Sequence, residues 1–582
     1  MSIRVGRKDS KSGRKGKLGK AGLTLPKLLR LASRRFPKRT ALIYFDNRLS
    51  YAALQEQADR CAAGLQALDI RPGDRVALMT QNCPQFVVAY FGALRAGAIV
   101  TPTSPIYTAR EAGHQWRDAG AKVLIVEQGL LPLAEKALAE CPDIRHVVVF
   151  KPEDYRPKPY AALVKALRKA AQPEKSRTLR WASLIGIGSK PRPIASRPGD
   201  IACLQYTGGT TGTSKGAMLT HANLVTNADQ ANRCGDAGKN GPDTAVAALP
   251  LFHIFAQTCV MICSIAAGGT VVILPRFERD AALRAIKRYR PAFFHGVPTM
   301  FLALSEAPNA RRYGLHSLRM CLSGGAPLPG EVAQRFEAVT GARLVEGYGL
   351  TESSPVTHVN PTDGTARRGS IGQVVLGTQA RIVDVETGTR EMPVGEPGEI
   401  VIRGPQVMKG YWRKPEETAR VLRRGWLHTG DIARRDADGF FYIVDRKKDL
   451  IIAGGFNIYP RDVEEVLFEH PQIKEAVVVG VPDRYRGETV KAFVVVKDGE
   501  QADPEEITAF CRERLASYKV PRLIEFRDSL PKSGVGKYLR RELRAEAAAA
   551  AAAAEAAAGP AAVCPDGQLP QHDPNLNTPA KS

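Results

Sequence analysis

The feature that most constrains this chain is a glycine- and threonine-rich segment, Tyr206-Thr-Gly-Gly-Thr-Thr-Gly-Thr-Ser-Lys-Gly216. Glycines let the backbone approach an oxyanion closely, and hydroxyls, backbone N–H groups and one lysine then surround phosphate oxygens. Apolar residues up to Leu204 place a strand before the segment, and a helix can start near Thr220. Gly216 follows Lys215, so the Walker A pattern GxxxxGK[ST] is absent. The segment predicts a phosphate-binding loop of another type.

The 582 residues exceed what one hydrophobic core usually organises, so two or more domains are expected. Residues 51–68 have helical apolar spacing, whereas 75–79, 123–126 and 147–150 read as strands, an alternation typical of α/β layering. A compact α+β pattern follows residue 449. We therefore predict an α/β protein with a large N-terminal domain (21–444), a hinge (445–449) and a small, mobile C-terminal α+β domain (450–545).

The formal net charge of +24 indicates an anionic partner, which could be nucleic acid, a membrane surface or a phosphorylated ligand. Residues 1–20 hold eight Lys or Arg and one acid, and are expected to be a disordered tail. Residues 151–199 hold 12 basic and three acidic residues and are expected to be a surface insertion with a short amphipathic helix. Residues 546–582 are expected to be an alanine-rich tail.

No stretch reaches the roughly 20 apolar residues that a membrane span needs, and no apolar core follows the basic start as in a secretory signal. A transit peptide is harder to exclude, since Asp9 is the one acid in the first 40 residues. The ten cysteines form no CxxC pair, which favours reduced thiols over a disulfide framework or zinc site. The expected location is the cytoplasm, with peripheral contact at the membrane surface as a hypothesis.

Four further segments are chemically dense. They are Ser323-Gly-Gly-Ala-Pro-Leu328, Glu346-Gly-Tyr-Gly-Leu-Thr-Glu352, His428-Thr-Gly-Asp431 and Pro531-Lys-Ser-Gly-Val-Gly-Lys537. Each alone would be read as a turn. Together with the phosphate loop, and in this order, they resemble the AMP-forming acyl-CoA synthetases of the adenylate-forming superfamily. The resemblance extends over residues 25–541 and comes closest to bacterial long-chain fatty acid ligases, as at Ile451-Ile-Ala-Gly-Gly-Phe-Asn-Ile-Tyr-Pro460.

The resemblance implies ATP, Mg²⁺ and coenzyme A as cofactor and substrates, and it assigns roles residue by residue. Lys537 would bridge carboxylate and phosphate during adenylation, and Lys448 would be the hinge residue. Thr210 and Glu352 would hold Mg²⁺, and Gly454 and Gly455 would line the CoA channel. The positions that would contact the nucleotide are Thr207, Gly208, Gly209, Thr210, Thr211, Gly212, Lys215, Gly325, Ala326, Gly347, Tyr348, Gly349, Thr351, Asp431 and Arg446.

The segment Leu249-Pro-Leu-Phe-His-Ile-Phe255 resembles the family's substrate gate, with His253 near the reacting carboxylate. No residue of this segment is placed to pair with the amino group of a substrate, which disfavours an amino acid as the acid that is activated. The expected activity is that of a long-chain-fatty-acid–CoA ligase (AMP-forming). Three alternatives stay open: an aryl or coumaroyl-type CoA ligase, a medium-chain ligase, and an acyl-AMP ligase.

Two hypotheses concern partners. The basic, amphipathic stretch around Lys165 could dock on anionic lipid. The alternative is a surface insertion whose charged face only contacts solvent. Nucleic-acid binding is not expected, because the excess charge lies in a tail and an insertion without interleaved aromatic residues. The sequence leaves the oligomeric state open, and a homodimer is one option.

Overall fold

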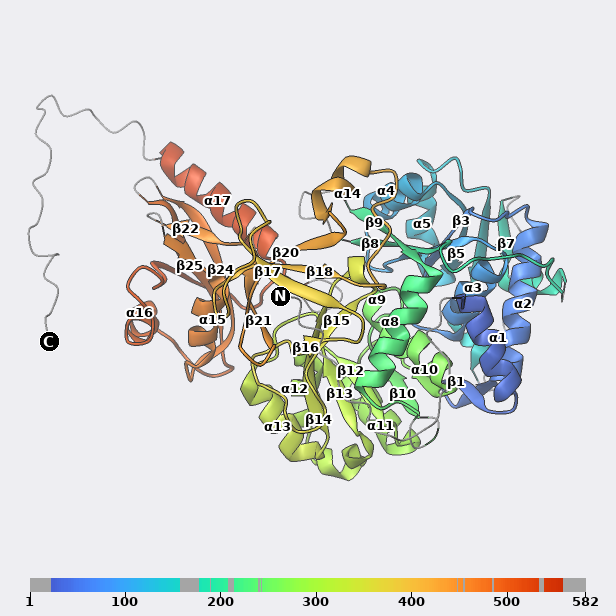
Figure 1. Ribbon diagram of the computed structural model, residues 1–582, viewed down its shortest axis with the longest axis horizontal. Coiled ribbons are helices and arrows are strands. Elements are labelled where there is room, and N and C mark those ends of the chain that lie inside the picture. The colour runs from blue at the N-terminus through green and yellow to red at the C-terminus, as the bar shows by residue number, and fades with distance from the viewer. Residues whose placement is uncertain are drawn as a thin grey trace, which may run out of the picture. The chain divides into compact units, whose positions relative to one another are not determined.

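The computed structural model describes residues 22–156, 177–188, 190–207, 214–238, 241, 243–446, 449–453, 456–483, 486–532 and 538–557. By its internal contacts the chain divides into two compact units (Figure 1). One comprises Met1–Lys448 and Lys532–Lys537, and the other comprises Asp449–Pro531 and Tyr538–Ser582. The first unit contains three sheets and the second contains one. The large N-terminal α/β and small C-terminal organisation expected from the sequence is confirmed.

The first sheet has seven strands, which are parallel except for the final hairpin. Its interior strands are buried on both faces, as expected for a parallel sheet covered by helices. In spatial order the strands are β7 (Thr178–Arg180), β6 (His146–Phe150), β5 (Ala121–Glu127), β3 (Arg75–Met79), β4 (Ile99–Thr103), β8 (Ile201–Thr207) and β9 (Lys215–Thr220). The helices of this region are α2 (Tyr51–Ala67), α3 (Pro84–Arg95), α4 (Ala109–Ala119), α5 (Leu131–Leu138) and α7 (Trp181–Gly186), with η1 (Gln128–Leu130) and η2 (Pro152–Tyr155).

The second sheet has nine strands and supports the remaining helices of the first unit. Their order is β16 (Gln373–Val374), β15 (Val356–Val359), β14 (Arg343–Gly349), β13 (Met320–Ser323), β12 (Phe293–Gly296), β10 (Thr244–Ala247), β11 (Thr270–Ile273), β1 (Thr40–Tyr44) and β2 (Asn47–Ser50). The associated helices are α1 (Leu25–Arg35), α8 (His221–Cys234), α9 (Ile254–Ala256), the π-helix η3 (Gln257–Ile262), α10 (Cys263–Ala267), α11 (Arg279–Tyr289), α12 (Pro298–Ser305), η4 (Ala310–Tyr313), η5 (Leu315–Ser317), α13 (Gly330–Thr340) and η6 (Thr351–Ser353).

A third, antiparallel sheet completes the first unit. It contains β17 (Gln379–Val383), β18 (Gly398–Arg403), β19 (Leu422–Arg423), β20 (Trp426–Arg435) and β21 (Phe441–Arg446), with α14 (Pro415–Val421) beside it. The second unit has β22 (Ile451–Ala453), β23 (Phe456–Ile458), β24 (Ile473–Asp483), β25 (Gly487–Val496) and β26 (Leu523–Phe526), with α15 (Pro460–Phe468), α16 (Pro504–Arg512) and α17 (Arg540–Ala557). Its apolar core lies between the sheet and these helices.

Local sequence explains where the helices that frame the site begin. The helix predicted near Thr220 is α8, and Thr220 and Asn223 form a reciprocal capping box: the Thr220 hydroxyl accepts from the Asn223 N–H at 3.1 Å, and Asn223 Oδ1 accepts from the Thr220 N–H at 2.8 Å. The strand before the phosphate loop is β8, as predicted. The chain then returns antiparallel as β9, which pairs Thr207 with Lys215.

Two sequence predictions need correction. Residues 151–199 are not wholly a surface insertion, because β7 extends the seven-stranded sheet and Trp181 of α7 is buried against Phe150, with ring centroids 6.0 Å apart. The alanine-rich tail does not begin at residue 546, since α17 continues to Ala557 and Ala547 is buried beside Val477. Alanine supplies high helix propensity, and its methyl group suffices for this close packing. The amphipathic helix and residues 1–20 lie outside the described residues.

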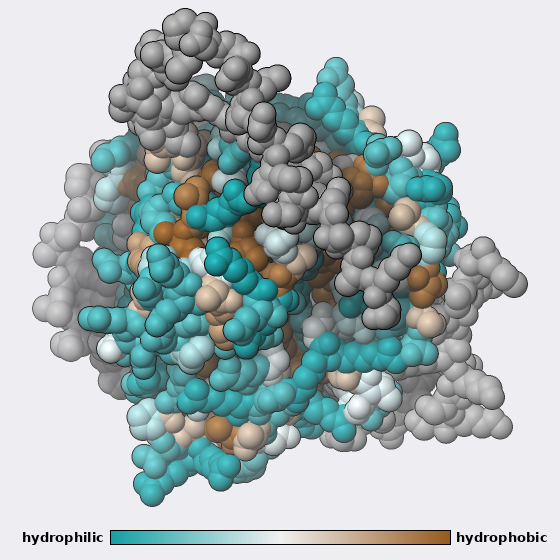
Figure 2. Space-filling view, turned by 90° about the vertical axis from the view of Figure 1, so that its left-hand side faces the viewer, coloured by the Kyte–Doolittle hydropathy of each residue, from teal (hydrophilic) through white to brown (hydrophobic). Residues whose placement is uncertain are grey.

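Among the residues that are coloured by hydropathy in Figure 2, hydrophilic ones predominate, with hydrophobic ones between them. None of the helices in the described part of the chain is long and apolar enough to cross a membrane.

Candidate functional site

The segments that resemble nucleotide-binding motifs converge at the carboxyl ends of strands in the first unit. Thr207 ends β8, Ser323 ends β13 and Gly349 ends β14. In open α/β sheets, ligands bind at this edge. Gly325 follows β13 with φ of 85°, a conformation that favours glycine, and the neighbouring Ala326 is half-buried. Because β13 and β14 are parallel neighbours in the nine-stranded sheet, the segments that follow Ser323 and Gly349 lie at the same edge of that sheet, whereas Thr207 ends a strand of the seven-stranded sheet.

Close backbone approach explains the glycines on either side of Tyr348. A Cβ on Gly349 would lie 2.0 Å from the Pro355 carbonyl oxygen, and one on Gly347 would lie 2.7 Å from Leu322 Cδ1. Side chains at either position would displace β14 from its neighbours. The two glycines thus fix where the Tyr348 ring lies.

Tyr348 and Asp431, which come from different sheets, are joined by a hydrogen bond. The Tyr348 hydroxyl donates to Asp431 Oδ2 at 2.5 Å. Asp431 lies on β20 opposite Arg446 in the β20–β21 register, and its N–H donates to the Thr429 hydroxyl at 3.1 Å. An aromatic ring and a carboxylate at this spacing suit a nucleoside, with the ring for the base and the carboxylate for ribose hydroxyls.

The carboxylate of Glu352 is held by a side chain that the sequence analysis did not single out. The Tyr411 hydroxyl donates to Glu352 Oε1 at 2.7 Å. Burial, and then the nearby Glu352 charge, raise the pKa of Tyr411, so it stays a donor across the physiological range. The Met408 N–H donates to the Glu352 carbonyl oxygen at 2.7 Å. Glu352 therefore presents one ordered carboxylate, and Thr351 lies beside it on η6.

Lys215 lies at the start of β9, where its ammonium forms an ion pair with Glu417 and faces the Tyr411 ring at 5.4 Å from the centroid. Burial, followed by the neighbouring Lys414, lowers the pKa of Lys215. The side chain is 14% exposed. A cation so positioned beside the loop can meet a phosphate, provided that it exchanges Glu417 for the new anion.

His253 caps α9, and its Nδ1 accepts the Phe255 N–H at 3.3 Å. Two buried amides anchor this turn: Asn82 Oδ1 accepts the Leu251 N–H at 2.7 Å, and Gln205 Nε2 donates to the Phe252 carbonyl oxygen at 2.8 Å. Gln205 belongs to β8, the strand that leads into the phosphate loop. The structure thus links the predicted gate segment directly to that loop, through residues with no motif to reveal them.

Several predicted residues lie outside the described part of the chain. They are Gly208, Gly209, Thr210, Thr211, Gly212, Lys448, Gly454, Gly455 and Lys537, together with the side chain of Arg446. No group of three or more potential metal-ligating His, Cys, Asp or Glu residues occurs among those that are described. One carboxylate is nevertheless compatible with Mg²⁺, which is commonly held by one or two carboxylates plus substrate phosphates.

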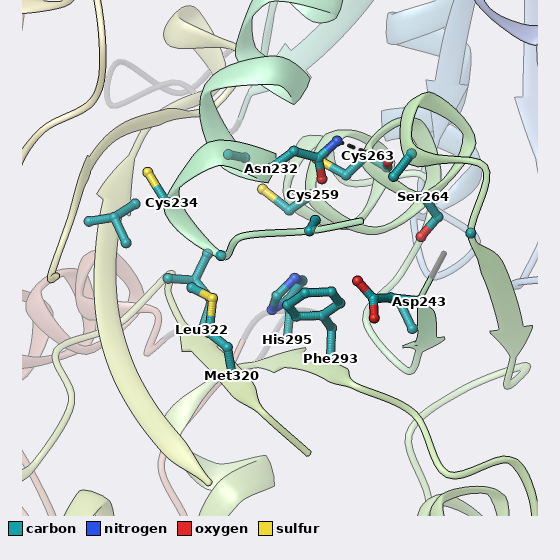
Figure 3. Close-up of a pocket in the computed structure, with 17 residues that line it drawn as sticks. Asn232, Cys234, Asp243, Cys259, Cys263, Ser264, Phe293, His295, Met320 and Leu322 are labelled. Carbon is teal, nitrogen blue, oxygen red and sulfur yellow. Dashed lines mark hydrogen bonds between the residues drawn. The ribbon is translucent and has the colours of Figure 1, made fainter. Parts of the chain in front are cut away.

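A cavity of about 40 Å³ lies between the nine-stranded sheet and the helical segment formed by α8, η3 and α10 (Figure 3). Phe293, His295, Met320 and Leu322 line it from β12 and β13, and Cys259 and Cys263 line it from η3 and α10. Leu322 is also the side chain that a Cβ on Gly347 would strike, so the cavity adjoins the nucleotide segments. The π-helical turn at Cys259 is itself a common mark of functional sites.

Two family profiles match consecutive parts of the chain. The profile described as AMP-binding enzyme matches residues 29–412, and that described as AMP-binding enzyme C-terminal domain matches residues 462–537. Among curated proteins, a long-chain-fatty-acid–CoA ligase of Bacillus subtilis is 46% identical over 90% of this chain and 94% of its own length. A feruloyl-CoA synthase of an Amycolatopsis species is 38% identical over 88% of this chain and 96% of its own length.

Solved structures share the fold. The anthranilate CoA ligase AuaEII, solved in complex with anthranoyl-AMP, matches with a TM-score of 0.81 and 28% identity over 92% of this chain and 99% of its own. ATP-bound MatB from Rhodopseudomonas palustris matches with a TM-score of 0.78 and 31% identity over 90% of this chain and 99% of its own.

Proposed function

Because the chain belongs to the AMP-binding enzyme family, we propose that it activates a long-chain fatty acid with ATP and transfers the acyl group to coenzyme A. In the first step a carboxylate oxygen attacks the α-phosphorus of ATP, forming acyl-AMP and releasing pyrophosphate. In the second step the CoA thiolate attacks the acyl carbonyl, forming the thioester and releasing AMP. The observation that carries this proposal is the 46% identity to a long-chain ligase across nearly the whole chain.

The nucleotide would be held by the converging polar segments. Tyr348 would stack on adenine, and Asp431 would accept the ribose hydroxyls while keeping the Tyr348 hydrogen bond. Thr207, Lys215 and the loop between them would surround the phosphates, with Lys215 exchanging Glu417 for a phosphate oxygen. Tyr348, Asp431 and Lys215 are each oriented by a partner before ATP arrives, which reduces the ordering needed on binding.

Mg²⁺ would be held by Glu352, fixed by Tyr411, and by the Thr210 hydroxyl. When bound, it would neutralise phosphate charge and favour departure of pyrophosphate. Lys537 would supply the cation at the carboxylate–phosphate pair. In the second step that lysine would obstruct the thiolate, so we propose a rotation of the small unit about Lys448 that brings Gly454 and Gly455 to the CoA channel.

The acyl group would enter the cavity lined by Cys259, Phe293 and Leu322, with His253 near the carboxylate. At about 40 Å³ this cavity is far below the roughly 300–1,000 Å³ of ordinary ligand pockets. A long chain would therefore have to displace lining side chains. Met320 suits this role, since methionine is unbranched and adapts its shape readily.

Pyrophosphate–ATP exchange with a panel of free acids, followed by CoA addition, tests the proposal. Hexadecanoate and octadecenoate should support exchange and then yield acyl-CoA. Preference for hexanoate would favour a medium-chain ligase, and preference for coumarate an aryl ligase, a candidate that the feruloyl-CoA synthase similarity also supports. Adenylation without any CoA-dependent step would identify an acyl-AMP ligase.

The same proposal places the enzyme in the cytoplasm with reversible docking on anionic lipid. Residues 151–199 carry a net +9, from 12 basic and three acidic residues, and basic residues near such lipid contribute about 1 kcal/mol each. Liposome binding should require anionic lipid, weaken with salt, and fall when Lys165, Arg168 and Lys169 are changed to Glu. Binding that survives these three changes would exclude this segment as the anchor.

A further inference from the structure

The polar side chains around the cavity differ in their hydrogen bonds. Asn232 Nδ2 donates to the Cys263 carbonyl oxygen at 3.0 Å (Figure 3). Asp243 is paired with Arg319 at 2.9 Å. By contrast, His295 Nδ1 is buried without a hydrogen-bond partner, and neither ring nitrogen bonds to a described residue. The side chain is only 9% exposed. Other side chains, such as His114 and His358, also have a buried nitrogen without a partner, but His295 lines a cavity that a ligand could enter. A ligand that makes the missing hydrogen bond would recover its free energy.

The ring is held firmly where it lines the cavity. His295 lies on β12 opposite Leu322 of β13, two residues from Phe293 and therefore on the same face of the strand. Its ring lies nearly parallel to that of Phe255, at 19° and 6.5 Å between centroids, and 6.1 Å from that of Phe293. Phe255 in turn contacts the Gly324 position beside the nucleotide segments. The imidazole is thus fixed by aromatic neighbours and has no freedom to seek another partner.

The protonation state of His295 suits recognition of an uncharged group. Burial lowers the pKa of this imidazole to about 4, so it is neutral at physiological pH. A neutral imidazole donates at one nitrogen and accepts at the other. It matches a hydroxyl, which can do both. A water molecule is the alternative occupant, because Asn232, Asp243 and Ser264 also line the cavity and buried water usually has two to four polar partners. A hydroxyl on the acyl group would replace that water and make the same two hydrogen bonds to the imidazole.

We propose that His295 is a specificity-determining residue that hydrogen-bonds a hydroxyl on the acyl group, so that hydroxylated acids are preferred over their unsubstituted counterparts. This inference rests on the proposed function, in which the cavity receives the acyl group. The hydroxyl belongs to a hydroxy fatty acid or to a phenolic acid. Both sources offer the same chemistry at the cavity wall, and a site built to bind a hydroxyl discriminates against the analogue that lacks it.

The test is kcat/KM for hexadecanoate against hydroxyhexadecanoates with the hydroxyl moved along the chain, and for coumarate against cinnamate. The wild type should prefer one hydroxylated acid by about 10-fold, equivalent to about 1.4 kcal/mol. His295→Leu should abolish that preference by lowering kcat/KM more for the hydroxylated acid than for the unsubstituted one, and it should leave the KM for ATP unchanged. His295→Gln should restore part of the preference. The exposed His316 provides the matched control, His316→Leu, which should change nothing.

Two results overturn the inference: no hydroxyl position is preferred by the wild type, or His295→Leu keeps the preference. If the Leu variant does not fold, the wild-type series and His295→Gln still decide. The series that contains the preferred acid, either the hydroxyhexadecanoates or coumarate, shows whether the hydroxyl belongs to a fatty acid or to a phenolic acid. Activation of acids without any hydroxyl preference refutes the role of His295 alone, whereas failure to activate any acid refutes the proposed function.

Discussion

The nucleotide segments and the cavity lie side by side in the first unit, yet they are built on opposite principles. At the nucleotide segments, polar side chains such as Tyr348, Asp431 and Glu352 are partly exposed and already hydrogen-bonded to one another or to Tyr411. The cavity is mostly apolar, and it is lined by one imidazole whose Nδ1 has no hydrogen-bond partner. Under the proposed function, ATP would be recognised by a prearranged polar surface, whereas the acid would be selected by shape and one polar contact.

The comparison makes a general prediction about variants. Changes at the nucleotide segments should alter the dependence on ATP or Mg²⁺ to the same extent with every acid. Changes at the cavity should alter the choice of acid at every ATP concentration.

The largest effect is expected from Lys537→Ala, which should reduce acyl-AMP formation by about 10²–10³-fold, because removing one group that stabilises developing charge in a transition state typically lowers the rate by that factor. Thioester formation from supplied acyl-AMP should survive, and its equal loss would contradict separate roles for Lys537 in the two steps.

Asp431→Ala should raise the KM for ATP by roughly 10–100-fold with every acid, because hydrogen bonds to a charged group contribute about 1.5–3 kcal/mol each. Steady-state kinetics at varied ATP measure this. Glu396→Ala removes an exposed carboxylate of the same unit and should have no effect. Wild-type affinity for ATP in the Asp431 variant would show that the carboxylate does not bind ribose.

Glu352→Gln should increase the Mg²⁺ concentration needed for half-maximal turnover, since a neutral amide is a poorer ligand for a hard cation. Tyr411→Phe should produce a smaller shift in the same direction, by releasing the carboxylate that its hydroxyl holds at 2.7 Å. Titration of activity with Mg²⁺ at fixed ATP distinguishes the two. If Tyr411→Phe is as impaired as Glu352→Gln, the tyrosine does more than orient the carboxylate.

Lowering the pH should have the smallest effect on activity but a clear effect on the stability of the fold. Burial lowers the pKa of His221 and His295 to about 4, and that of His358 to about 3. The unfolded chain takes up these protons near pH 6.5 and the folded chain does not, so stability falls as the pH falls below 6.5. At pH 5 each histidine should cost about 2 kcal/mol. Thermal melting at pH 7 and pH 5 measures the loss, and an unchanged melting temperature would argue against neutral, buried histidines.

The two regions also differ in how far sequence alone could predict them. The motifs and their order singled out Tyr348 and Asp431 as candidates, through the resemblance to a known family. Apolar spacing predicted α2 and β3, and the residues from Thr220 onward predicted the start of α8. The cavity could not be predicted, since its lining comes from many separated segments with ordinary apolar residues. In the sequence, His295 is an ordinary residue of an apolar strand, and only the structure reveals that its Nδ1 has no hydrogen-bond partner. Tyr411 was likewise invisible without the contact to Glu352.

Pyrophosphate–ATP exchange in the absence of CoA tests the central claim most directly. With hexadecanoate and MgATP, the chain should catalyse exchange of labelled pyrophosphate into ATP. Addition of CoA should then produce acyl-CoA and AMP in equal amounts. Formation of ADP and phosphate, or no exchange with any fatty acid, would contradict the assignment of this chain as an AMP-forming acyl-CoA ligase.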